Sequence, residues 1–424
     1  MTVGPKARAV DTDSDAGVSK NAGLYVHVPF CSAVCPYCDF AVKKGGREKV
    51  PPYLAALRRE LDWLAERARS SGPGDQLATL LAGPFDTLYF GGGTPSVLGE
   101  EDLAGLIQHL RGVLPFAAET RLFFEANPED VSPASLEGWR RQGVHLLSPG
   151  VQSLYDVALR LLGRRHTAAE AEAAIRAARE AGFPTLSFDL IYGRPGQDPE
   201  AWRRELETAV ALRPDHLSLY ELEIHERTSF GKRKARGAFR ELPEPLQAEL
   251  FELTHRVLAD HGYEAYEVSN FARGPEHRSG HNQKYWHHVP YLGLGPGAHS
   301  YSQDLRWWNL RDEPTWRRAL KDGLAPIEAA ETLEPEDLAL ESLMLGLRTR
   351  EGADLAEIRR RWGIDVVAGN AARIAAWIEN GFLESIPELL RPTLKGYAVA
   401  DRLAAELELQ GRASAAQVAQ LPVL

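Results

Sequence analysis

The stretch "GLYVHVPFCSAVCPYCDF", residues 23–40, joins a short apolar segment to a group of three cysteines. Its first part, "GLYVHV" (23–28), is rich in residues that favour β-strands. Cys31, Cys35 and Cys38 follow it, and they are the only cysteines among the 424 residues. A strand with such a group directly behind it predicts a sheet whose strand ends carry the chemistry.

The same strand unit recurs along the chain, each time separated from the next by a helical segment. Five further strands are expected at 86–90, 121–125, 144–153, 185–193 and 216–223. Helices are expected at 51–70, 101–114, 132–143, 167–182 and 198–212. Strands that alternate with helices at this spacing predict a parallel sheet with helical crossovers. We therefore expect an α/β fold built on a partial (β/α)6, TIM-like barrel.

Unusual residues stand late in each expected strand or behind its end. In chain order they are the cysteines, "GGGTP" (91–95), Glu125, Gln152, Asp189 and Glu226. In parallel sheets and barrels, ligands bind at the carboxyl ends of the strands. The pattern across all six strands therefore predicts one shared site.

The three cysteines allow several interpretations. Three buried structural thiols would be a coincidence in a chain that otherwise lacks cysteine. A structural zinc ion needs four ligands and no second cysteine pair exists, although His27 or Asp39 could complete a set. Iron–sulfur cubane clusters are held by thiolates, and three thiolates leave one iron open for a ligand. The spacing favours the cluster, with zinc as the alternative.

The motif "CSAVCPYC" (31–38) resembles the radical S-adenosylmethionine (SAM) superfamily, in which three cysteines hold a [4Fe-4S] cluster and SAM binds the fourth iron. Further segments resemble the oxygen-independent coproporphyrinogen III oxidases and their relatives, among them "YFGGGTPS", "FEANPE", "FDLIYGRPGQ" and "HNQKYW". The resemblance runs from residue 24 to about 300, and "ESLMLGLRTREG" (341–352) resembles the C-terminal domain of that family. It implies that the barrel is a radical SAM core.

Phe40 separates two branches of this family. The oxidases have a fourth cysteine close behind the third, and this chain has Phe40 at that position. "CPYCDF" and "HNQKYW" resemble the HemW branch of heme chaperones. That resemblance implies heme binding and delivery to acceptor proteins such as respiratory enzymes, and it leaves open whether SAM is cleaved. An oxygen-independent coproporphyrinogen III oxidase and a zinc-stabilised binding protein are the rival hypotheses.

The resemblance also implies roles for individual residues. Cys31, Cys35 and Cys38 would hold the cluster, and SAM would contact Tyr25, Tyr37, Gly92, Gly93, Thr94, Glu125, Gln152, Arg164 and Asp189. Glu125 would accept the ribose hydroxyls, although an ion pair at the barrel rim would also explain a carboxylate there. Asp189 falls inside an apolar strand, where an unpaired charge is costly, so it needs a ligand or Arg164 as its partner.

His281 begins the motif "HNQKYW" and is the expected heme ligand by resemblance. A neutral imidazole is a normal axial ligand of heme iron. Tyr285 and Trp286 of the same motif would offer an apolar face to a porphyrin. A hydrogen-bonded core histidine is the alternative interpretation of His281.

One expected strand departs from the family pattern. Related sequences resemble "GVNRLSIGVQS", whereas this chain reads "GVHLLSPGVQS" (143–153) and so has His145, Leu146 and Pro149 at the changed positions. Leu146 removes a cation that could pair with a buried acid. A proline interrupts a sheet ladder unless it lies at a strand end, so the geometry near Gln152 is open.

Composition excludes several classes of protein. A net charge of -10 argues against non-specific binding to nucleic acid, which needs a basic surface. No apolar run approaches the length of a membrane span, and the first residues lack the apolar stretch of a signal peptide. An odd, tightly spaced set of cysteines fits a reducing compartment better than a disulfide framework. We expect a cytoplasmic protein, at most peripheral at the membrane, and a homodimer stays open.

The chain divides into four expected parts. Residues 1–20 form a polar tail, expected to be disordered, and 21–235 form the core with the cluster and SAM sites. Residues 236–314 form a linking region that contains "HNQKYW". Residues 315–424 are expected to form a mostly helical, winged-helix-like domain.

Overall fold

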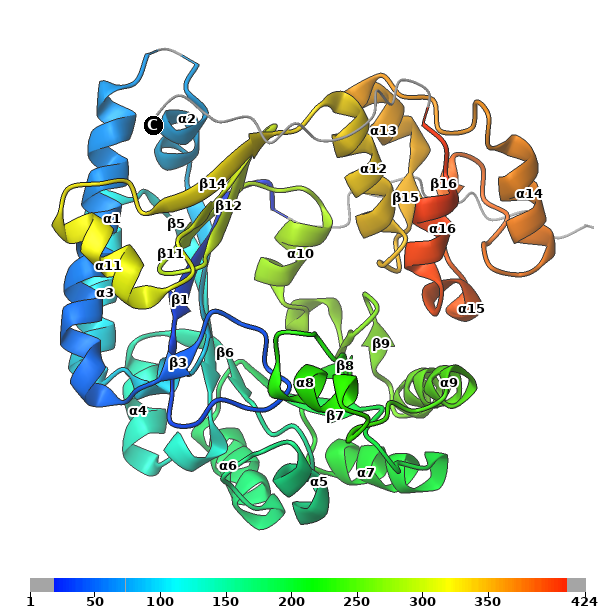
Figure 1. Ribbon diagram of the computed structural model, residues 1–424, viewed down its shortest axis with the longest axis horizontal. Coiled ribbons are helices and arrows are strands. Elements are labelled where there is room, and N and C mark those ends of the chain that lie inside the picture. Colours follow the sequence, from blue (N-terminus) through cyan, green and yellow to red (C-terminus); the bar gives the residue numbers. More distant parts are fainter. Residues whose placement is uncertain (1–18, 73, 410–424) are drawn as a thin grey trace, which may run out of the picture.

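The computed structural model describes residues 19–72 and 74–409, so the expected tail lies almost entirely outside the described residues. Six neighbouring strands pair in parallel, each with the next along the chain (Figure 1). They are β1 (Ala22–Val28), β4 (Phe85–Gly92), β5 (Phe116–Ala126), β6 (Val144–Pro149), β7 (Thr185–Tyr192) and β8 (His216–Glu221). This arrangement confirms the expected partial (β/α)6 barrel.

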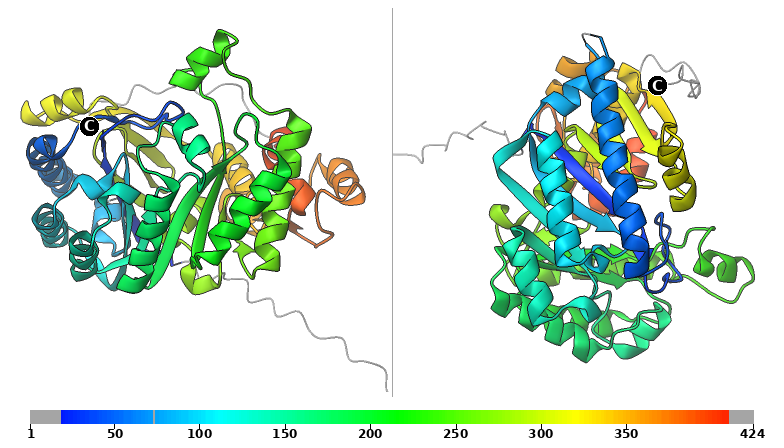
Figure 2. Two further views of the ribbon diagram at one scale, coloured as in Figure 1. Left: turned by 90° about the horizontal axis from the view of Figure 1, so that it is seen from below. Right: turned by 90° about the vertical axis from the view of Figure 1, so that its left-hand side faces the viewer.

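Helices cover the outer face of the curved sheet, as Figure 2 shows. The crossover helices are α1 (Val50–Ser70), α3 (Glu100–Val113), α4 (Pro133–Arg141), α6 (Ala168–Ala181) and α7 (Pro199–Ala211), with the shorter α2 (Gln76–Ala82) and α5 (Asp156–Leu161). Local signals fix their ends. The Thr167 hydroxyl accepts from the Glu170 backbone N–H at the start of α6, and Gly182 adopts a left-handed φ of 74° at its end.

The sheet continues beyond the six strands on both sides. On one side β11 (Tyr291–Leu294) pairs in parallel with β1, and β12 (His299–Ser302), β13 (Leu305–Asn309) and β14 (Ile327–Thr332) follow antiparallel. On the other side β10 (Asn270–Ala272) and β9 (Glu264–Ala265) pair antiparallel beyond β8. The segment 236–314, expected to link two domains, thus supplies strands to both edges of the sheet.

Three further helices belong to this part of the molecule. α8 (Ser229–Ala235) follows β8, and α9 (Glu244–Asp260) packs against α7, where the Trp202 indole donates to the Thr254 hydroxyl at 2.8 Å. α10 (Gly280–Trp286) lies between the sheet and the C-terminal helices (Figure 1). None of the described helices is long and apolar enough to cross a membrane.

The C-terminal part has a hydrophobic core of its own, from Ala339 to Leu409. It contains α12 (Pro335–Gly346), α13 (Leu355–Trp362), α14 (Ala371–Glu379), α15 (Leu394–Tyr397) and α16 (Ala400–Glu406), with a short antiparallel pair of β15 (Ala353–Asp354) and β16 (Leu389–Leu390). The expected boundary at 315 falls inside α11 (Glu313–Lys321), which packs on α1. We therefore propose a boundary near residue 333, after β14 has completed the sheet.

Candidate functional site

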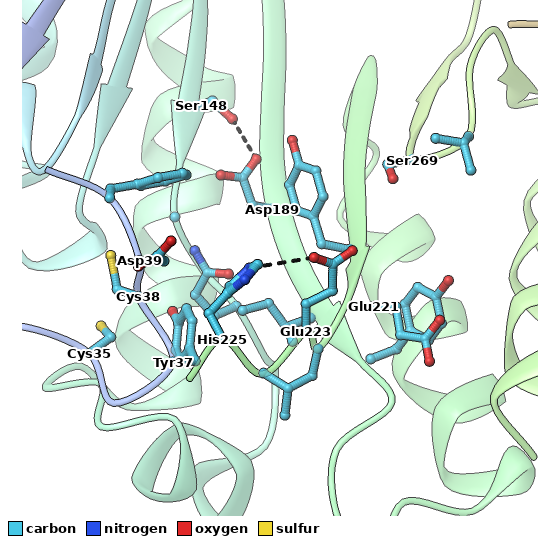
Figure 3. Close-up of a pocket in the computed structure, with 18 of the residues that line it drawn as sticks. Cys35, Tyr37, Cys38, Asp39, Ser148, Asp189, Glu221, Glu223, His225 and Ser269 are labelled. Atoms are coloured by element: carbon cyan, nitrogen blue, oxygen red, sulfur yellow. Dashed lines mark hydrogen bonds and ion pairs between the residues drawn. The ribbon is translucent and has the colours of Figure 1, made fainter. Parts of the chain in front are cut away.

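The three cysteines lie on the loop between β1 and α1. Cys31 ends the short strand β2 (Phe30–Cys31), which pairs with β3 (Lys43–Lys44) farther along the same loop. The Cys38 backbone N–H donates to the Cys35 carbonyl at 3.2 Å and so closes a turn. All three side chains line one cavity of about 1040 Å³, and Figure 3 shows Cys35 and Cys38 at its side. We call it the cysteine cavity.

The thiols fit an iron–sulfur cluster better than a single metal ion. Among residues 19–72 and 74–409, no three His, Cys, Asp or Glu side chains converge as a mononuclear site requires. A cluster does not need that convergence, because each thiolate binds a different iron. His27 and Asp39 are also committed elsewhere. The His27 ring nitrogens lie 3.0 Å from the Tyr25 hydroxyl and from the Ala41 carbonyl, and Asp39 pairs with Arg227 at 3.0 Å.

The surroundings of the thiols bear on their charge. Burial raises the pKa of the Cys31 thiol to about 11, although a hydrogen bond from the Thr94 hydroxyl at 3.6 Å opposes the shift. Burial also raises the pKa of Cys38. The Arg164 guanidinium lies 3.5 Å from the Cys35 sulfur. A metal must displace the thiol protons on binding, and Arg164 offsets the negative charge that results.

The glycines behind β4 are required by packing within the protein. A Cβ on Gly93 would lie 2.7 Å from the Phe30 carbonyl oxygen, and Gly92 has a φ of +105° with the His27 ring 2.5 Å from its Cβ position. Both glycines and Thr94 also line the cysteine cavity. Two explanations therefore apply to these glycines. Packing within the protein requires them, and they also allow the expected close approach of a cofactor.

Two partly buried carboxylic acids line the cysteine cavity, Glu125 on β5 and Asp189 on β7. The Tyr89 hydroxyl donates to Glu125 at 2.7 Å, and burial, reinforced by the nearby Asp189, raises the pKa of Glu125 to about 7. Asp189 accepts from the Ser148 hydroxyl at 3.1 Å (Figure 3), and burial raises its pKa to about 6. Arg164 makes no ion pair with Asp189, so this acid has hydroxyl partners where the sequence suggested a guanidinium.

Gln152 and Arg164 follow the end of β6, and backbone groups hold both of them. Gln152 has a left-handed φ of 67°, unusual for a residue other than glycine, and its backbone N–H donates to the Asp189 carbonyl at 2.7 Å. Arg164 donates to the Asn127 side chain at 2.8 Å and to the Gly150 carbonyl at 2.9 Å, while its buried Nε has no hydrogen-bond partner among the described residues.

The departures in the fourth strand affect its ladder differently: the pairing of β5 with β6 shifts register beside His145, and Pro149 closes the strand. Pro149 is the last residue of β6 and faces Ala126 of β5, so the missing N–H falls at the strand end. Leu146 is buried and lies between β5 and β7. No cation from this position reaches Glu125 or Asp189, which is consistent with the raised pKa of both acids.

The structure brings most of the expected SAM residues together, but it places Tyr25 and Tyr37 differently. Tyr37 lines the cysteine cavity together with the other expected residues. Tyr25 does not, because its hydroxyl lies 3.0 Å from a ring nitrogen of His27 and its ring packs at 5.9 Å from that of Tyr89. Eight of the nine expected SAM residues therefore share one cavity, with Tyr25 outside its lining.

His281 is placed as a core residue. Its side chain is buried, Nδ1 lies 2.9 Å from the Thr87 hydroxyl, and Nε2 lies 2.8 Å from the Tyr285 hydroxyl. Burial lowers the pKa of the ring to about 3. With Tyr25, Tyr89, Phe123 and Tyr285, His281 forms an inner aromatic cluster. This arrangement does not fit the expected axial ligand, because both ring nitrogens are engaged and the ring does not line the cavity.

Sequence reasoning missed the outer wall of the cavity. It is lined by Gln247 and Phe251 of α9, by Arg348, and by the segment 397–402 of the C-terminal part, next to Trp286 at the end of α10, which the motif had already suggested as a porphyrin contact. Glu223 and His225 of the turn after β8 complete it. The expectation that ligands bind at strand ends pointed to this turn. It selected Glu226, however, which does not line the cavity.

Comparisons with known proteins agree with this architecture. Residues 25–209 match the radical SAM superfamily, and residues 333–399 match the HemN C-terminal domain. The second match begins where β14 ends. Coproporphyrinogen III oxidase (HemN) from Escherichia coli, described as a radical SAM enzyme, superposes with a TM-score of 0.75 over 92% of this chain and 91% of that chain. At 23% identity this likeness establishes the fold.

Sequence relatives are more specific. Heme chaperone HemW of Mycobacterium tuberculosis is 34% identical over 385 residues, which are 89% of this chain and 93% of that protein. Heme chaperone HemW of Bacillus subtilis is 32% identical, over 80% of this chain and 86% of the relative. A mitochondrial relative from Bos taurus, radical S-adenosyl methionine domain-containing protein 1, is 34% identical over 80% of this chain and 76% of its own length. The chain therefore belongs to the HemW family within the radical SAM superfamily.

Proposed function

We propose that this protein is a heme chaperone of the radical SAM type. It holds a [4Fe-4S] cluster through Cys31, Cys35 and Cys38, binds SAM and heme, and delivers heme to an acceptor protein. The relatives named heme chaperones, which align with most of the chain, support this proposal. One observation carries it furthest: a single cavity contains the three cysteines and continues to the C-terminal part.

The size and lining of the cysteine cavity suit more than one ligand. Its volume of about 1040 Å³ lies at the upper end for small-molecule sites, which usually span roughly 300–1000 Å³. The inner part offers thiols, glycine backbone and acids. The outer part offers Phe40, Trp286 and Phe251, which are apolar surfaces of the kind that a porphyrin packs against. The cavity therefore has room and chemistry for SAM inside and heme outside.

The inner residues complement SAM in charge. SAM carries a positive sulfonium and a positive amino group, and Glu125 and Asp189 are partly buried acids of this wall. Burial raises the pKa of each acid and so favours its protonated form. A cation nearby would favour the ionised form instead. Arg164 balances the charge of the thiolates. When bound, the cluster and SAM supply one-electron chemistry; the protein orients them and excludes water.

Anaerobic reconstitution of the full chain with iron and sulfide tests the proposal. We expect about four irons and four sulfides per chain, a cluster spectrum that changes on adding SAM, and a Soret band on adding heme. Heme should then pass to apomyoglobin as a probe acceptor, and the loaded protein should lose its Soret band as the acceptor gains one. A wild-type chain that gains no Soret band would refute the chaperone function.

The same preparation separates the rival activities. Turnover of coproporphyrinogen III with SAM under anaerobic conditions would identify an oxidase, whose family motif has a cysteine where this chain has Phe40. A colourless protein that contains zinc but no sulfide would identify a zinc-stabilised binding protein. The acceptors implied by the resemblance are respiratory enzymes, which brings the chaperone to the membrane surface as a peripheral protein.

A further inference from the structure

We propose that His225, in the turn after β8, is the protein ligand of the heme iron. The inference rests on the proposed function, since it assumes that heme binds in the cysteine cavity. All thirteen histidines lie within the described residues, and His225 is the one among them whose side chain lines this cavity. His281, the ligand suggested by the motif, lies outside the lining with both ring nitrogens hydrogen-bonded.

The other residue types that bind heme iron leave few competitors. Heme iron takes histidine, cysteine, methionine or tyrosine as axial ligand. The cysteines are assigned to the cluster, Met344 packs against the C-terminal core, and Met1 lies outside the described residues. The tyrosines of the lining include Tyr220, on β8, and Tyr397, in the C-terminal part. A neutral imidazole needs no deprotonation, whereas burial raises the pKa of both phenols above their ordinary value.

The His225 ring lies near a carboxylate. Its Nε2 lies 3.5 Å from a carboxylate oxygen of Glu223, and Figure 3 shows the two side chains together at the cavity. A carboxylate near one ring nitrogen is the usual neighbour of a ligating histidine. The ring makes no side-chain hydrogen bond with any other described residue and is 50% exposed, so its second nitrogen is accessible to a ligand.

The turn that carries His225 is anchored to the cysteine loop. The Phe230 backbone N–H donates to the Pro36 carbonyl at 2.8 Å, and Arg227 pairs with Asp39 at 3.0 Å. Gly231 is required there, because a Cβ would lie 2.2 Å from the His225 carbonyl oxygen. The backbone below the imidazole is therefore held against the loop of Cys35 and Cys38, which pre-organises the ligand before heme arrives.

The space around His225 can receive a porphyrin, which has an apolar macrocycle and charged propionates. Phe40 is 68% exposed and lines the cavity, as do Trp286 and Phe251, so the macrocycle has apolar surfaces. Arg348 also lines the cavity and pairs with Asp401 at 2.5 Å. A propionate that approaches Arg348 would find a cation at the rim. The cysteine-facing wall and the C-terminal part would then hold opposite edges of the same heme.

Heme titration of the full-length wild type and three variants tests whether His225 is the ligand of the heme iron. The variants are His225→Ala, His281→Ala and His261→Ala, the last an exposed histidine outside the cavity that serves as the matched control. Each is titrated with ferric heme and followed by the Soret band and by electron paramagnetic resonance. We expect His225→Ala to shift the Soret band and weaken affinity at least about tenfold, since losing even an outer partner of a metal ligand costs about 10–100-fold. His261→Ala should match the wild type.

Free imidazole supplies a second readout that does not depend on the folding of His281→Ala. Adding imidazole to heme-loaded His225→Ala should restore the wild-type spectrum, because it fills the vacated position. A His225→Ala protein with wild-type spectrum and affinity overturns the inference, as does a spectrum lost only in Tyr220→Phe or Tyr397→Phe. In each of those cases the wild type still binds heme and the chaperone proposal stands. A wild type without a Soret band removes both.

Discussion

The inner aromatic cluster and the cysteine cavity lie side by side within one curved sheet, and both contain polar side chains. Tyr89 connects them, because its ring belongs to the cluster while its hydroxyl donates to Glu125 in the cavity. In the cluster, His281 is satisfied by protein partners on both nitrogens. In the cavity, Asp189 has only hydroxyl partners and the Arg164 Nε has none among the described residues.

In these two regions, the difference distinguishes a core from a candidate ligand site. A buried polar group with all its hydrogen bonds made inside the protein stabilises the fold and has no capacity left for a ligand. A buried group with unmet capacity costs free energy until something binds it. The cysteine cavity therefore shows the pattern of a ligand site, and the inner aromatic cluster shows that of a core.

The largest expected effect comes from removing the three cysteines of the cavity. Replacing Cys31, Cys35 and Cys38 together by alanine should abolish cluster assembly, because each thiolate holds one iron. Iron and sulfide after anaerobic reconstitution should fall to the level of a blank. Val34→Ala, in the same loop but not a thiol, is the matched control and should keep its cluster. Retention of iron and sulfide by the triple variant would show that these thiols are not the ligands.

The next effect concerns the stability of the inner aromatic cluster. His281→Ala removes a buried ring and leaves the Thr87 and Tyr285 hydroxyls without their partner. We expect a loss of about 3–5 kcal/mol in the free energy of unfolding, measured by urea denaturation of the metal-free protein. His225→Ala, at an exposed position, should change it by less than about 0.5 kcal/mol. Equal stability of the two variants would contradict the assignment of His281 to the core.

The pH dependence of that stability checks the cause. The pKa of His281 is about 3 in the folded state and 6.5 in its ordinary state, so the unfolded chain binds a proton more readily. The contribution of His281 is therefore complete above pH 6.5 and is lost as the pH falls toward 3, by up to about 1.4 kcal/mol per pH unit. The His281→Ala protein should show a shallower loss over this window than the wild type.

An intermediate effect of opposite sign belongs to the cavity. The pKa of Glu125 is about 7 in the folded state against 4.5 ordinarily, so its penalty appears as the pH rises from 4.5 to 7. Glu125→Gln removes the ionisation and should stabilise the SAM-free protein by about 2 kcal/mol at pH 8, with little change at pH 4. Urea denaturation at both pH values measures this. Affinity for SAM, measured by calorimetry, should fall in the same variant; a more stable variant that binds SAM normally would argue against a contact.

The smallest effect compares two left-handed glutamines. Gln152 (φ 67°) lines the cavity, whereas Gln303 (φ 58°) lies in the turn between β12 and β13. Replacing either by glycine should relieve backbone strain, with a net gain of at most about 1 kcal/mol in the free energy of unfolding. Only Gln152→Gly should weaken SAM binding. If both variants bind SAM equally well, the side chain of Gln152 has no part in the site.

Most of the barrel could be predicted from sequence because its signals are local. The period of apolar residues, the Ser132 and Thr167 caps and the stop at Gly182 all lie within the element they define. Strands β11 to β14 were not expected as part of the sheet. β11 is short, and what makes it a strand is its pairing with β1, near the start of the chain. Such long-range hydrogen bonding leaves little trace in a local window.

The site divides in the same way. The cysteines and the strand-end residues could be expected together, because parallel strands bring their carboxyl ends to one edge. The place of His281 could not be read from "HNQKYW", since the same letters allow the ring to face the cavity or the core. The docking of α10 between the sheet and α12 directs His281 inward and leaves Trp286 at the cavity.

The sequence by itself determined the parallel barrel, the group of three cysteines and the strand ends where a site forms, because these follow from periodicity and from spacing along the chain. Only the tertiary structure decided which polar side chains have unmet hydrogen-bonding capacity. It engaged both nitrogens of His281 and left the ring of His225 accessible at the cysteine cavity. The physical reason is that satisfaction of a polar group depends on partners from distant segments, and packing alone sets those partners.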